Sequence, residues 1–85
     1  MIFYHNIMII EKMQYSKDIR DFMREKRLAT GKSLNTFAFD ADIDPAILSR
    51  VENKKQGVKL DMLQKFVATL DMKLSDFFLE FEQNN

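Results

Sequence analysis

The 85-residue sequence has no cysteine and no tryptophan, and it has only two glycines and one proline. The absence of cysteine excludes disulfides, thiolate metal sites and cysteine nucleophiles, and it mildly favours a cytoplasmic protein without redox chemistry. The shortage of glycine and proline argues against an all-β fold, because such folds need many turn residues. We therefore expect a helical protein.

Long apolar runs are also missing. The apolar stretch at residues 1–10, MIFYHNIMII, is about half the roughly 20 residues that a membrane-spanning helix needs, and polar residues interrupt it. It lacks the basic segment and the cleavage site of a signal peptide. Because Met8 and Met13 offer later translation starts, we treat residues 1–15 as an N-terminal extension that is disordered or artefactual, an edge strand, or a small dimerisation tag.

Charge of one sign is not in excess, since 13 basic residues balance 13 acidic ones. A net charge of zero argues against a nucleic-acid partner, because neutralising phosphates supplies much of such binding. The distribution weakens this objection: residues 16–32 carry six basic and three acidic side chains, a net of 6 − 3 = +3, and residues 54–59 add three lysines. These basic segments can steer DNA locally, although Asp40 and Asp42 would reduce affinity.

Apolar residues recur at the i, i+3, i+4 spacing of helices that bury one face. We expect one domain over residues 16–82 with five helices, followed by a short tail at residues 83–85. Ser16 is the expected N-cap of the first helix and Ser33 that of the second. The last helix begins at Ser75 or the residue before it. The apolar stripe of the fourth helix consists of Leu60, Leu63, Phe66, Val67 and Leu70.

Residues 34–53, LNTFAFDADIDPAILSRVEN, have the form of two short helices joined by a tight turn. Asp42 fits the turn because aspartate tolerates a left-handed backbone better than most residues. Asp44 and Pro45 form a strong helix start, since the carboxylate accepts from free amides and proline at the first position loses no hydrogen bond. The second helix carries Ser49, Arg50 and Asn53. This pattern is the outline of a DNA-reading helix-turn-helix.

With its surroundings, the SRVEN segment at residues 49–53 resembles the lambda-repressor-like, or Cro/C1-type (XRE family), helix-turn-helix domains. The resemblance covers roughly residues 16–81. It implies an all-α, compact five-helix domain that has its helix-turn-helix at the second and third helices and binds double-stranded DNA. Besides SRVEN, it rests on the LSDFF ending and on Arg27, Gly31, Phe37, Ala38, Ile43, Leu48, Leu60, Leu63, Phe66 and Leu70.

The resemblance also assigns roles to individual residues. Arg50 is the strongest base reader, since a guanidinium can bind guanine O6 and N7 together. Arg27 is expected to pair with Glu52 as a structural ion pair. The positions facing the major groove are Pro45, Ala46, Ser49 and Arg50. The expected phosphate contacts are Asn35, Thr36, Asn53, Lys54 and Lys55.

Three positions depart from the family pattern. Leu34 stands where the family often has a phosphate-binding glutamine, which puts one phosphate contact in doubt. Asp42 replaces the turn glycine, and Lys54 replaces a glycine after Asn53. The last change adds a positive charge. Because few donors face the groove, we expect modest specificity or reliance on DNA shape and paired half-sites.

The final helix carries more aromatic surface than one buried face needs. Most of it should complete the core, and part of it could pair with a second copy of the chain, because apolar surface is costly to leave in water. We expect a homodimer on a short pseudo-palindrome with half-sites about one helical turn apart. The candidate interface residues are Phe77, Phe78 and Phe81.

The resemblance leaves the biological role open among phage-type repressors, controllers of restriction-modification systems, and antitoxins, which would have a toxin as protein partner. A rival hypothesis is a protein-interaction module of the same fold that has lost specific DNA reading. An enzyme is not expected, because the single histidine, His5, has no catalytic partner residues and the acids do not converge. Asp40, Asp42 and Asp44 lack the glycine and glutamate of a calcium loop. We expect no cofactor, no metal and no small-molecule ligand.

Overall fold

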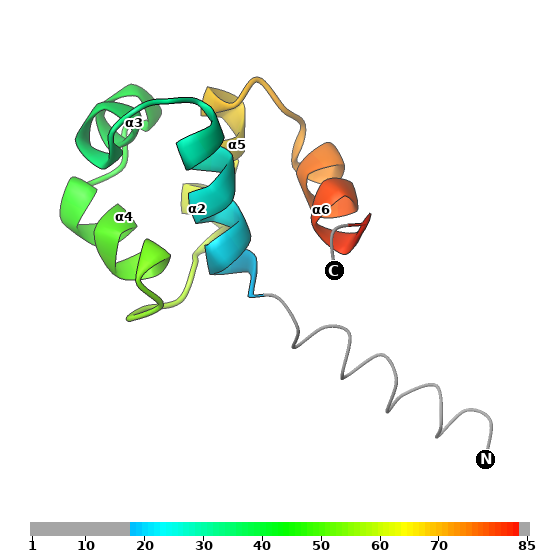
Figure 1. Cartoon of the computed structure of the whole chain (residues 1–85), viewed down its shortest axis with the longest axis horizontal. Coiled ribbons are helices and arrows are strands. Elements are labelled where there is room, and N and C mark those ends of the chain that lie inside the picture. Colours follow the sequence, from blue (N-terminus) through cyan, green and yellow to red (C-terminus); the bar gives the residue numbers. More distant parts are fainter. Residues whose placement is uncertain (1–17, 84–85) are drawn as a thin grey trace, which may run out of the picture.

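The computed structural model describes residues 18–83, so the expectations for residues 1–15 and for the last two residues lie outside it. Within the described residues the chain forms five helices and no strand, which confirms the expected all-α architecture. The helices are α2 (Ile19–Ala29), α3 (Leu34–Ala41), α4 (Pro45–Glu52), α5 (Leu60–Thr69) and α6 (Leu74–Gln83). In Figure 1, α3 and α4 lie at one end of the fold and α6 lies at the other.

Helices α2, α3 and α4 begin at short polar side chains that cap them, whereas Lys59 before α5 makes no side-chain cap hydrogen bond. Ser33 accepts a hydrogen bond from the amide of Thr36, and Asp44 accepts one from the amide of Ala46, as predicted. The cap of α2 is Asp18, which accepts from the amide of Arg20. Ser16, the predicted cap, lies two residues earlier and outside the described residues. Aspartate and serine are equally good caps, so sequence preference could not choose between them.

Several connections need a left-handed backbone. Asp42 takes this conformation with φ 57°, as the sequence predicted for the turn between α3 and α4. Lys54, just after α4, has φ 59°, and Gly31, after α2, has φ 77°. A left-handed conformation is uncommon for a residue with a Cβ atom. Lys54 therefore occupies a position where glycine would fit with less strain.

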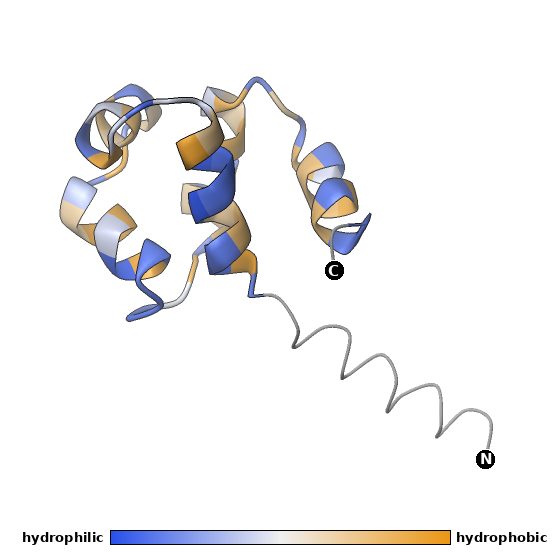
Figure 2. Ribbon diagram, viewed as in Figure 1, coloured by the Kyte–Doolittle hydropathy of each residue, from blue (hydrophilic) through white to orange (hydrophobic). Residues whose placement is uncertain are grey.

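Phenylalanines from four helices form the centre of the core. The rings of Phe37 and Phe66 lie 4.7 Å apart, and those of Phe22 and Phe77 lie 5.1 Å apart. Phe37, Phe66 and Phe77 have no exposed surface. In Figure 2, polar and apolar residues alternate around the helices, as expected when each helix buries one face. The packing joins α6 to α2 and places α4 against both α2 and α3.

The buried state of Phe77 corrects one expectation. Phe77 cannot contact a second chain, because its side chain is enclosed in its own core. Phe81 is half-buried, and its ring lies 5.5 Å from that of Phe22. The exposed apolar residues of α6 are Phe78, at 36%, and Leu79, at 53%.

No helix within residues 18–83 is long and apolar enough to cross a membrane.

Candidate nucleic-acid interface

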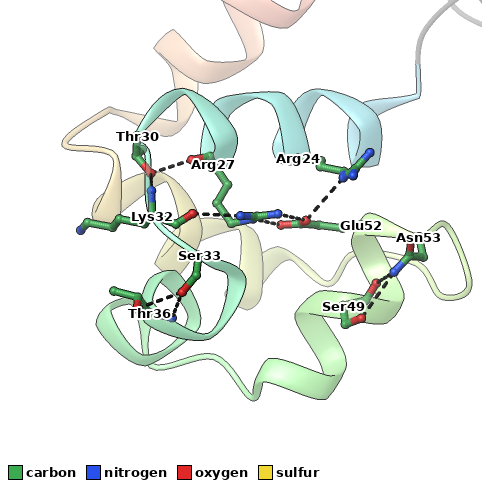
Figure 3. Close-up of polar contacts among 9 residues, drawn as sticks. All are labelled: Arg24, Arg27, Thr30, Lys32, Ser33, Thr36, Ser49, Glu52 and Asn53. Carbon is green, nitrogen blue, oxygen red and sulfur yellow. Dashed lines mark hydrogen bonds and ion pairs between the residues drawn. The ribbon is translucent and has the colours of Figure 1, made fainter.

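A buried ion pair supports the third helix of the domain, α4. Arg27 of α2 donates from Nε to Glu52 Oε2 at 2.7 Å and from a terminal nitrogen to Oε1 at 2.9 Å. Both residues are buried, with exposed fractions of 7% and 4%. Donating hydrogen bonds to the Glu52 carboxylate raises the pKa of the Arg27 guanidinium above its usual value. The structure thus brings together the two residues expected to pair (Figure 3).

The same guanidinium also holds the segment that precedes α3. Its remaining terminal nitrogen donates to the backbone oxygen of Lys32 at 3.0 Å. The Thr30 hydroxyl donates to the backbone oxygen of Arg27 at 2.6 Å. Arg27 therefore connects α2, the loop before α3 and the end of α4, as Figure 3 shows. A bidentate guanidinium restrains orientation as well as distance, so the pair restrains how α4 lies against α2.

The outer face of α4 carries the four residues expected to face the groove. Pro45, Ala46 and Arg50 are exposed, and Ser49 is half-buried. The opposite face of α4 is fully enclosed by the fold and consists of Leu48, Val51 and Glu52. Among the four outer residues, only Arg50 has a long side chain with several hydrogen-bond donors. The chemical capacity of this face to read a base therefore depends mainly on Arg50.

Arg50 has a partner that sequence reasoning missed. Its Nε donates to Gln56 Oε1 at 2.8 Å. Gln56 lies in the connector after α4, and no helical spacing links it to position 50. The chain returns to Arg50 because the amide of Lys55 donates to the Arg50 backbone oxygen at 2.7 Å and Lys54 takes a left-handed conformation. No sequence signal would have identified this contact, since it depends on the path of the loop.

The three candidates for phosphate contact after α4 differ in their surroundings. Asn53 donates from its side-chain nitrogen to the backbone oxygen of Ser49 at 2.9 Å, so it also caps the end of the helix. Lys54 pairs with Asp21 of α2 at 3.3 Å. Lys55 is exposed and has no ion-pair partner within residues 18–83. Lys55 is therefore the cation most available to a phosphate in this segment.

The start of α3 offers the other two expected contacts. Asn35 and Thr36 are both exposed in the first turn. The Thr36 hydroxyl accepts from the Ser33 hydroxyl at 3.0 Å, and its own hydrogen remains able to donate. In Figure 3, Ser33 and Thr36 lie on one side of the Arg27–Glu52 pair, and Ser49 and Asn53 lie on the other. Leu34 is half-buried and packs against the core, so its side chain does not replace the missing glutamine.

The acids near the turn are partly neutralised. Asp40 pairs with Lys32 at 2.8 Å, and Asp42 pairs with Lys65 at 3.6 Å. These ion pairs reduce the repulsion that the sequence led us to expect from the two carboxylates, although exposed pairs screen charge only incompletely. Within residues 18–83, no group of three or more histidine or acidic side chains is placed to hold a metal ion.

Another ion pair lies where α2 begins. Asp18 accepts from the Arg20 side chain at 3.0 and 2.7 Å. These hydrogen bonds lower the pKa of Asp18 from 3.8 to about 2. Arg20 in turn donates to the backbone oxygen of Gln56 at 3.1 Å. Arg20 thereby joins the start of α2 to the loop between α4 and α5.

Comparisons with known proteins agree with this geometry. The family model described as helix-turn-helix matches residues 23–77, a span that contains α3 and α4 in full. The chain is similar to the control protein C.MunI of a Mycoplasma species, with 32% identity over 72 residues that cover 85% of this chain and 93% of that protein. No solved structure matches the chain.

Proposed function

Because this chain belongs to the XRE-type helix-turn-helix family and is a DNA-binding transcriptional regulator, we propose that it acts as a homodimer on a short pseudo-palindromic operator. In this proposal α4 enters the major groove and reads sequence. The observation that carries it is the exposed face of α4, with Arg50 as its one long donor, held in place by the buried Arg27–Glu52 pair.

The proposed division of labour follows the chemistry of the side chains. Arg50 binds a guanine, which contributes about 1 to 3 kcal/mol of discrimination against other bases. Pro45 and Ala46 offer only apolar contact to a base, for example to a thymine methyl group. The Ser49 hydroxyl can donate to or accept from any of several bases. The phosphates are bound by the start of α3 and by Asn53, Lys54 and Lys55, and these contacts set position without reading sequence.

The second subunit is proposed to bind through α6. Phe78 and Leu79 supply exposed apolar surface there, and this surface is costly to leave in water. Because α6 lies at the end of the fold opposite α4 in Figure 1, pairing through α6 would hold two α4 helices well apart. Two successive major grooves on one side of DNA are about 34 Å apart, and such an arrangement can match that spacing.

Among compact regulators of this family, we propose that the chain is a control protein of a restriction-modification system. The support is its similarity to a control protein along almost the full length of that relative. A phage-type repressor and an antitoxin are the alternatives. The genes beside this one discriminate: an endonuclease and methyltransferase pair supports a control protein, and an adjacent toxin gene contradicts it.

DNA selection tests the reading role. The purified full chain is incubated with random duplexes at moderate salt, and bound sequences are read. We expect a two-fold-symmetric motif to be enriched. No enrichment, with binding absent or equal for all sequences, would overturn specific reading and favour a protein-interaction module.

The dimer is tested separately by sedimentation equilibrium. The parent chain should sediment as a dimer, and Leu79→Asp should shift it to monomer because a carboxylate would be buried at the interface. Phe39→Asp is the matched control, since Phe39 is 85% exposed on α3 and lies outside the proposed interface. A monomeric parent, or a Leu79→Asp protein that stays dimeric, would contradict the role of α6.

A further inference from the structure

The hydrogen bond between Arg50 and Gln56 uses a particular part of the arginine. Gln56 Oε1 accepts from Nε at 2.8 Å. A guanidinium has one donor hydrogen on Nε and four on its two terminal nitrogens. The contact with Gln56 therefore leaves both terminal nitrogens available. Two donors that point in the same direction are what recognition of guanine O6 and N7 requires.

Gln56 is itself restrained through its backbone. Its backbone oxygen accepts from an Arg20 terminal nitrogen at 3.1 Å, and Arg20 is held by Asp18 at 2.7 Å. Gln56 is half-buried, whereas Lys54 and Lys55 before it are exposed. Contacts from α2 thus fix the backbone that presents the Gln56 amide.

Restraint of this kind matters for an exposed arginine. Arg50 has a long side chain with several rotatable bonds, and ordering it at an interface costs free energy on binding. A side chain already held by a hydrogen bond loses less freedom when it meets its base. A partner that binds only Nε orders the arginine without competing for the donors that face the groove.

We propose that Gln56 is a positioning residue that orients Arg50 for base recognition, with Arg20 and Asp18 holding the Gln56 backbone in place. This inference deepens the proposed function and rests on it, because it requires that Arg50 reads a base. Gln56 acts through Arg50 and contributes selectivity at the base pair that Arg50 reads, while other base pairs keep their contribution.

A double-mutant cycle on DNA binding tests the inference. Affinity of the full chain is measured for the selected operator and for operators changed at one base pair at a time. Arg50→Ala identifies the base pair that Arg50 reads. Gln56→Ala should reduce the preference at that base pair by roughly 3- to 10-fold. In the Arg50→Ala background it should have no effect there, since the side chain it orients is gone.

Two further variants separate positioning from a general effect on the loop. Gln56→Glu keeps an acceptor for Nε, so it should retain the preference while weakening binding to all operators through its added negative charge. Gln64→Ala removes an exposed glutamine from α5 and is the matched control, which should leave the preference unchanged. Circular dichroism checks that each variant is folded.

The outcomes are distinguishable. A Gln56→Ala effect confined to the Arg50 base pair and lost with Arg50 supports the inference. An unchanged preference, or equal weakening on all operators in both backgrounds, overturns it while leaving the reading role of Arg50 intact. If the parent shows no preference, or Arg50→Ala changes none, the proposed reading role itself fails and the inference fails with it.

Discussion

Removal of Arg27 should have a large effect on folding, because it leaves a carboxylate buried without its partner. Glu52 is 4% exposed and loses two hydrogen bonds of 2.7 and 2.9 Å in an Arg27→Ala variant. Removing one partner of a buried ion pair costs about 3 to 5 kcal/mol. Arg24, whose Nε lies 4.0 Å from Glu52 Oε1, offers partial compensation and places the expected loss toward the lower end.

This loss is a large fraction of the total stability. Small domains unfold with a free energy of about 5 kcal/mol or a little more, so a loss of about 3 kcal/mol would leave Arg27→Ala mostly folded at 25 °C, with about 2 kcal/mol of stability remaining. Urea denaturation followed by far-ultraviolet circular dichroism measures the change. With a slope of about 1 kcal/mol per molar urea, the midpoint should fall by about 3 M or more.

Two comparisons make the reasoning refutable. Glu80→Ala breaks the Lys26–Glu80 pair, which is partly exposed, and should cost about 0 to 1 kcal/mol. The double variant with Arg27→Met and Glu52→Leu should recover most of the stability, because apolar residues of similar volume replace both charges. A loss below about 1 kcal/mol for Arg27→Ala would show that the pair behaves as two solvated charges and would refute the argument.

Two further predictions concern charge. Lys55→Ala should weaken binding to all DNA sequences alike and reduce the slope of log affinity against log salt by about 1. Lys54→Ala should reduce it less, because Lys54 must leave Asp21 to reach a phosphate; equal slopes would contradict this ranking. The hydrogen bonds with Arg20 lower the pKa of Asp18 from 3.8 to about 2. The stabilising contribution of Asp18 is therefore fully present above pH 3.8 and is lost as the pH falls to about 2. Asp18→Asn keeps a capping side chain, and its stability deficit, measured by denaturation at several pH values, should shrink over this range; a constant deficit would exclude the ion pair as the cause.

Much of the fold could be predicted from sequence, because the signals are local. Ser33 and Asp44 cap their helices and Asp42 takes the left-handed turn, and each of these depends on a residue's own conformational and hydrogen-bonding preferences. The apolar spacing likewise predicted most of the buried faces, although Leu60, expected in the apolar stripe of α5, is 60% exposed at the first position of that helix. The first helix start was placed wrongly, since Asp18 and Ser16 are equivalent by preference and only the packed chain selects between them.

The candidate site likewise has features that the residue types predict and features that only the tertiary structure decides. The chain's own residue types determined that α4 would offer one strong base-reading donor, Arg50, followed by basic residues. The tertiary structure decided which lysine is available, because Asp21 of α2 pairs with Lys54 and leaves Lys55 without an ion-pair partner in residues 18–83. It also decided that Gln56 holds Arg50, since that contact depends on how the loop folds back. Local preference is set by each residue and its neighbours, whereas pairing across the fold depends on where the packed helices place distant segments.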